Sequence, residues 1–139
     1  MKWVTREHVA VDRVACPWLI KRFIDQNAVF EFVAYDTDPE TVKDGIPFDM
    51  KGVELGHRGN NCSFEAIIEK YDLKDPVLLE LARIVHAADV PEDIESAPEG
   101  AGLRAIAAGF RAICHDDHET LEKELIVYDA LYEYCKAKV

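Results

Sequence analysis

The chain has 139 residues, of which 49% are hydrophobic, and its formal net charge at pH 7 is −11, with a sequence pI near 4.8. The length fits one domain spanning residues 1–139, and the apolar content is too high for a disordered chain. The excess of acid excludes binding to nucleic-acid phosphates by this chain alone and docking on an anionic membrane, because both need surplus Lys and Arg. It favours cationic partners, metal ions among them.

The sequence contains no apolar run as long as those of secretion signals or membrane spans. We therefore expect a cytoplasmic protein. The four cysteines are far apart and include no CxxC pair, which predicts free thiols in a reducing compartment.

The N-terminal third predicts a mixture of strands and one helix. Residues 3–5 and 28–35 are rich in strand-forming side chains. Pro17 is favourable at the first position of a helix, so we expect a helix over residues 17–25 with Cys16 as its N-cap. Residues 36–51 predict a loop with room for one helical turn. Residues 53–55 predict a short strand, followed by a turn-rich loop over 56–61.

The remaining chain predicts four helices. Ser63 can cap the first, which runs to about residue 72, and Asp75-Pro76 is a strong start signal for the second. A third helix covers residues 101–113, and the last begins near Asp116 or Asp117. The core face of the last helix consists of Leu121, Leu125, Tyr128, Leu131, Tyr132 and Cys135. Strands followed by helices indicate an α+β fold, in which a small sheet of about three strands carries about four helices.

Cys16 is the first candidate for chemistry. The N-terminus of a helix stabilises a thiolate, and Arg13 and Arg22 are near in sequence. The same helix start, with an arginine, could instead hold an oxyanion. The alternative is a buried cysteine in front of a core helix, since free cysteine is among the most often buried residues.

His57 is the second candidate, because it stands among glycines that permit the close approach of a ligand. Glu54 and Cys62 are near in sequence, and all three are metal-ligand types. In an unbroken strand Glu54 and His57 would point to opposite faces, so they converge only if the strand ends by Gly56. The alternative is a surface histidine beside a solvated glutamate.

His86 and Asp89 are the third candidate, because a spacing of three residues places both on one side of a helix. Asp89 continues an apolar stripe formed by Leu78, Leu81, Ala82 and Val85. A buried carboxylate there needs a cation, a metal or several donors, whereas a helix ending earlier leaves Asp89 in water. Asp129 lies beside the core residue Tyr128 and either reaches a site or is solvated. Residues 115–119, HDDHE, are better explained as a helix cap than as a metal cluster.

Several short motifs follow one another along the chain in an order that resembles the motif order of one known family. The most specific is DRVACPWLI followed by RFID, within residues 12–25. PFD at 47–49, GVEL at 52–55 with His57, CSF at 62–64 and AD at 88–89 continue the pattern. AGL at 101–103 with AI at 105–106, DDH at 116–118 and YDALY at 128–132 complete it. This order resembles the chromate-resistance domain family, which includes the C-terminal domain of the chromate-operon regulatory protein B.

The resemblance implies a role in the response to chromate, through sensing or handling an oxyanion or a metal. It agrees with the physical candidates Arg13, Cys16, His57, Cys62, Asp89 and Asp129. The regulator also has an N-terminal domain, so we do not expect direct gene regulation from this chain alone.

The first functional hypothesis is an accessory domain of chromate or oxidative-stress resistance. It would hold one divalent transition metal through His57 and Asp89, with His86, Glu54 or Asp129 completing the shell. Arg13 and Arg22 would attract a tetrahedral oxyanion such as chromate or sulfate.

Two rival hypotheses remain open. The chain could be a redox enzyme, either metal-dependent or with Cys16 as a catalytic low-pKa thiolate and Cys62 as the resolving thiol. Alternatively it is a protein-interaction module, which would act as a homodimer or with a separate partner domain.

Overall fold

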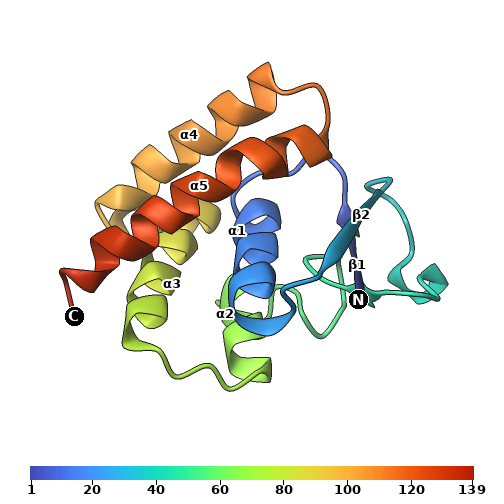
Figure 1. Ribbon diagram of the computed structural model, residues 1–139, viewed down its shortest axis with the longest axis horizontal. Helices are drawn as coiled ribbons and strands as arrows, with labels where there is room; N and C mark the ends of the chain where they lie inside the picture. The colour runs from blue at the N-terminus through green and yellow to red at the C-terminus, as the bar shows by residue number, and fades with distance from the viewer.

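The computed structural model describes all 139 residues and has five α-helices and three short strands. Figure 1 shows the helices gathered on one side of the molecule, with the small sheet and its loops on the other. The α+β class is therefore confirmed. No helix is both long enough and apolar enough to cross a lipid bilayer.

The sheet consists of β1 (Lys2–Arg6), β2 (Val29–Val33) and β3 (Ile46–Pro47) in the order β2-β1-β3, with both pairings parallel. The strands expected at residues 3–5 and 28–35 are thus confirmed. The strand expected at 53–55 is wrong, since the third strand lies earlier and Leu55 forms a single bridge to Phe48. The chain turns between them, with Gly52 at a φ of 81° that favours glycine.

Helix α1 (Asp12–Leu19) connects β1 to β2 and continues into a π-helical turn at Ile20–Ile24. The expected start at Pro17 is wrong: Pro17 lies inside α1, and Cys16 is a helix-interior residue instead of its N-cap. The carboxylate of Asp12 stabilises this earlier start, because it accepts hydrogen bonds from the backbone N–H groups of Ser63 and Phe64 at the start of the next helix. A local sequence pattern does not contain this tertiary anchor.

The C-terminal helices are α2 (Ser63–Lys70), α3 (Pro76–Asp89), α4 (Glu99–Ile113) and α5 (Asp117–Lys136), and 3₁₀ turns occupy Pro39–Thr41 and Pro91–Ser96. As expected, the carboxylate of Asp75 caps α3 and that of Asp116 caps α5. The N-cap of α2 is Cys62, one residue before the expected Ser63. Within the acidic run at 115–119, Asp116 is therefore the cap of α5 and Glu119 accepts the backbone N–H of His115, as expected of a helix start.

The core lies where α5 packs across α1, α3 and α4 (Figure 1). Its largest fully buried side chains include Trp3, Trp18, Tyr128, Phe48 and Phe64. Burial of such side chains is the main favourable contribution to folding. Because α1 and α3 are both fixed by this core, the start of α1 and the end of α3 are held in place.

Candidate metal centre

Four side chains that are distant in sequence converge beside the sheet. Asp12 opens α1, Asp49 follows β3, His57 lies in the next loop, and Asp89 is the last residue of α3. The His57 Nε2 atom lies 2.8 Å from Asp89 Oδ2 and 3.9 Å from Asp12 Oδ2, and its Nδ1 lies 3.3 Å from Asp49 Oδ1. The structure thus brings together the His57 and Asp89 expected from sequence.

Asp12 is the most buried of the three carboxylates, with 2% of its side chain exposed. Its Oδ2 accepts the backbone N–H of Ser63 at 2.7 Å, and its Oδ1 accepts that of Phe64 at 3.1 Å. These two donors belong to the free first turn of α2. Burial, and then the nearby charges of Asp89 and Asp49, raise the pKa of Asp12 well above its ordinary value.

His57 is the half-exposed member of the group, at 48% of its side chain. Its hydrogen bonds to Asp49 and Asp89 raise its pKa to about 10. The imidazole therefore carries a proton at neutral pH, and this proton supplies positive charge among three carboxylates. Two small clefts of about 280 and 410 Å³ both have His57 in their walls, so solutes can reach it.

Arg13 does not offer a free guanidinium to an oxyanion. Its Nε lies 3.1 Å from Asp49 Oδ2, and its Nη1 donates to the carbonyls of Arg6 and Glu7. Asp49 is fixed in turn by the hydroxyl of Ser63, which donates to its Oδ1 at 2.6 Å. The role of Arg13 in this structure is therefore to neutralise and hold Asp49.

Three other expected site residues lie away from this group. Arg22 forms two hydrogen bonds with the carboxylate of Asp129, at 3.0 and 2.9 Å, and Trp18 Nε1 donates to the same carboxylate. Glu54 is exposed and pairs with Lys70 at 3.3 Å. Asp129 and Glu54 are thus not placed to complete the His57 shell, and Arg22 has no unpaired charge for an anion.

His86 also points elsewhere, although it stands one turn before Asp89 on α3. Its Nδ1 lies 2.6 Å from Glu65 Oε1 and its Nε2 lies 2.7 Å from Asp93 Oδ2. The three-residue spacing puts His86 and Asp89 on the same side of α3. The His57 side chain contacts Asp89 at the end of this helix, however, and His86 lies one turn too early to join it. His86 belongs to a separate group with Cys62 and Glu65.

The thiol of Cys16 is fully buried, and burial together with the neighbouring Asp12 raises its pKa well above the ordinary value. The expectation of a low-pKa thiolate at a helix start is therefore wrong, because the helix begins one turn earlier. Burial and Asp12 raise the pKa of Cys62 as well. All four cysteines are free thiols, as expected.

Sequence reasoning missed Asp12 and Asp49 as members of the site. Asp12 opens the DRVACPWLI motif and Asp49 ends the PFD motif. Neither lies in an expected helix or strand, so no local spacing indicates a ligand. Glu65 was missed as well, because its capping-box spacing of three residues counts from Cys62, whereas the expected cap was Ser63. Its side chain does accept the backbone N–H of Cys62 at 2.9 Å.

Comparison with known proteins places these residues in a family. The family model described as "ChrB, C-terminal domain" matches residues 3–135, which include every member of the site. The chain belongs to the ChrB C-terminal domain family. This confirms the resemblance drawn from the motifs.

Protein ChrB of Cupriavidus metallidurans is 35% identical to this ChrB-type domain over 134 residues. The match covers 96% of this chain and 40% of that protein, so the chain spans less than half the length of this relative. No solved structure matches the chain.

Proposed function

We propose that this ChrB-type domain binds one divalent metal ion between Asp12, His57 and Asp89, and that it serves chromate resistance in the metal-bound form. The observation that carries the proposal is the convergence of the three side chains. One ligand atom from each lies within 4.8 Å of the other two. Ligand atoms bound to a common ion at about 2.0–2.2 Å are roughly 3 Å apart, so small side-chain rotations suffice.

The charges of the group support a cation. Three carboxylates face two positive groups, Arg13 and the protonated His57, and Arg13 is fixed on Asp49. A metal ion bound by His57 would replace its proton and reduce the repulsion between Asp12 and Asp89. The same charges oppose an oxyanion, and the two arginines expected to attract one are paired with aspartates.

The ligand types narrow the choice of ion. Imidazole suits iron, zinc, copper and nickel, whereas carboxylates suit manganese, magnesium and calcium. One imidazole with two carboxylates and no thiolate fits a transition ion that accepts oxygen and nitrogen ligands together, such as Mn²⁺ or Fe²⁺. Three protein ligands leave further coordination positions, and the half-exposed imidazole shows that water or an exogenous ligand can reach them.

Elemental analysis of untagged protein by inductively coupled plasma mass spectrometry tests the proposal. His57→Ala should lose one equivalent of transition metal relative to wild type, while the exposed control His115→Ala should retain it. The same His57→Ala variant should lose any chromate tolerance that the wild-type domain confers on a sensitive host. Equal metal contents in folded His57→Ala and His115→Ala would contradict the proposed site.

A further inference from the structure

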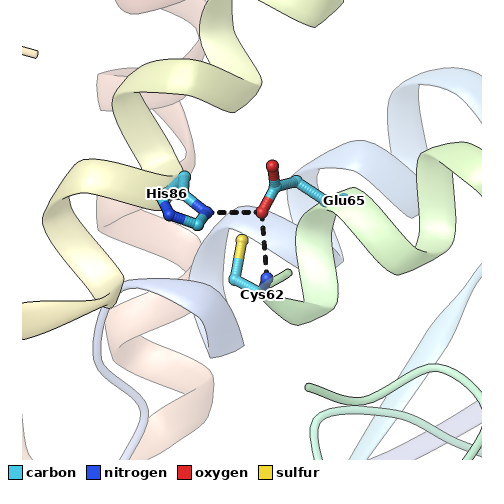
Figure 2. A group of neighbouring side chains, drawn as sticks. All are labelled: Cys62, Glu65 and His86. Atoms are coloured by element: carbon cyan, nitrogen blue, oxygen red, sulfur yellow. Dashed lines mark hydrogen bonds and ion pairs between the residues drawn. The ribbon is translucent and has the colours of Figure 1, made fainter. Parts of the chain in front are cut away.

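A second group of metal-ligand side chains lies between the start of α2 and helix α3. Figure 2 shows Cys62, Glu65 and His86, with the sulfur of Cys62 directed into the space between the imidazole and the carboxylate. One ligand atom from each residue lies within 4.8 Å of the others. Glu65 and His86 also line a cavity of about 720 Å³, whereas Cys62 is fully buried.

Hydrogen-bond partners orient the side chains of His86 and Glu65. Asp93 Oδ2 lies 2.7 Å from His86 Nε2, so Nδ1 is the nitrogen that faces Glu65. A carboxylate on the far nitrogen of a ligating histidine is the usual outer-shell arrangement in metal sites, because it fixes the ring and raises its basicity. The carboxylate of Glu65 is held by the backbone N–H of Cys62.

We propose that Cys62, Glu65 and His86 form a second metal site, which takes a thiophilic divalent ion of the Zn²⁺ class. The three protein ligands would leave the fourth position of a tetrahedral ion facing the cavity, as in zinc sites that bind a water or a substrate. Binding replaces the thiol proton of Cys62 and the proton shared by Glu65 and His86, and both leave to solvent. The thiolate and carboxylate then balance the charge of the ion.

The geometry requires little movement. Glu65 Oε1 and His86 Nδ1 are 2.6 Å apart, which is hydrogen-bond distance. Two ligands bound tetrahedrally at about 2.0–2.1 Å are roughly 3.3 Å apart, so the pair must open by less than an ångström. Glu65 is the more exposed of the two and lies at the cavity wall, so its side chain can supply this movement while Asp93 keeps the ring of His86 in place.

This site differs in chemistry from the group around His57. Cys62 and Ser63 are consecutive, and Ser63 N–H binds Asp12 while Cys62 faces His86, so the two groups share a backbone but no ligand. Thiolate selects zinc-like ions, whereas the nitrogen and oxygen ligands of the first group do not. The inference therefore stands independently of the proposed function.

Titration of the metal-free full chain with Co²⁺, followed by near-ultraviolet absorption, tests the site. Co²⁺ bound to a thiolate gives a sulfur-to-cobalt charge-transfer band that a nitrogen and oxygen site lacks. We expect this band to saturate at one equivalent in wild type and to be displaced by Zn²⁺. Cys62→Ser should abolish it, and Ser remains a good helix cap, so the fold is retained.

Three further variants make the outcome specific. His86→Gln should weaken Co²⁺ binding at least tenfold, while Cys114→Ser, which removes a thiol at the end of α4, should leave the band unchanged. His57→Ala should also keep the band, which separates this site from the first. Absence of the band in wild type, or its loss in Cys114→Ser but not in Cys62→Ser, would overturn the inference and leave the His57 site untouched.

Discussion

Glu124 lies on α5 and is fully buried, and neither oxygen of its carboxylate has a hydrogen-bond partner in the protein. Burial raises the pKa of Glu124 to about 7. The folded state therefore holds a proton that the unfolded state releases near its ordinary pKa of 4.5. Between the two pKa values, 4.5 and about 7, the free energy of unfolding falls as the pH rises, because the folded state binds more protons than the unfolded state.

This gives a pH-dependent prediction. The contribution of Glu124 is most favourable below about pH 4.5, declines as the pH rises to about 7 and is constant above it, a total loss of roughly 3 kcal/mol. Glu124→Gln stays neutral and should escape this loss. Urea unfolding at pH 5 and pH 8 should show the variant gaining stability relative to wild type at pH 8. An equal difference at the two pH values would contradict the assignment.

Asp12 and Asp89 are both proposed ligands, but their structural roles differ. Asp12→Ala leaves the buried N–H groups of Ser63 and Phe64 without acceptors and should lower the free energy of unfolding by about 2–4 kcal/mol. Asp89→Asn keeps a polar side chain at a partly exposed helix end and should cost less than about 1 kcal/mol. Denaturant titration of the metal-free variants checks this, and comparable losses would contradict it.

At the scale of single residues, the sequence identified two of the four side chains in the candidate metal centre. His57 stood out because of its glycine-rich loop, and Asp89 because a carboxylate continued an apolar stripe. Asp12 and Asp49 were missed because their partners are 51 and 14 residues away at Ser63. Arg13 was recognised as charged, but its pairing with Asp49 depends on how the chain folds after β3.

At the scale of elements, α4 packs against α3 through a glycine. A Cβ atom added at Gly100 would lie 2.8 Å from the Cβ of Ala87 and 3.1 Å from its carbonyl carbon. Gly109 lies on the same helix with nothing within 4 Å of such an atom. The two positions therefore form a matched pair for testing the close approach of the two helices.

Gly100→Ala should lower the free energy of unfolding by about 1–3 kcal/mol, because the helices must move apart. Gly109→Ala should raise it by up to about 1 kcal/mol, since alanine favours the helix and meets no neighbour. Thermal unfolding of both variants measures the difference. A stabilised Gly100→Ala variant would show that α3 and α4 are not packed this closely.

The elements that carry local signals were predicted well. The Asp75-Pro76 pair marks the start of α3, and Asp116 marks that of α5, because a cap and a first-position proline act within one turn. The start of α1 was predicted wrongly from Pro17, since the contacts that extend the helix back to Asp12 come from α2. The third strand was misplaced because two residues, Ile46 and Pro47, are too few to show a period.

At the scale of the whole molecule, α5 ties the separate parts together. Asp117 accepts the backbone N–H groups of His8 and Val9, and the hydroxyl of Tyr128 donates to the carbonyl of Val11. These contacts span more than 100 residues of sequence and fix the segment that leads into Asp12. The proposed metal centre therefore depends on a helix that contributes no ligand to it.

The net charge of −11 also belongs to this scale, because it favours the approach of cations to the whole surface. Non-specific attraction of this kind would be reduced little by the loss of one charge. A built site, in contrast, loses most of its affinity when one ligand is removed. The difference between these two behaviours decides whether the group around His57 is a metal centre.

Calorimetric titration of the metal-free domain with Mn²⁺, for wild type and Asp89→Asn in parallel, measures this difference directly. We predict one equivalent of bound Mn²⁺ in wild type and an affinity at least tenfold lower in the folded variant. Equal affinities in the two proteins, or no binding to wild type, would contradict the proposal that Asp12, His57 and Asp89 hold a metal ion.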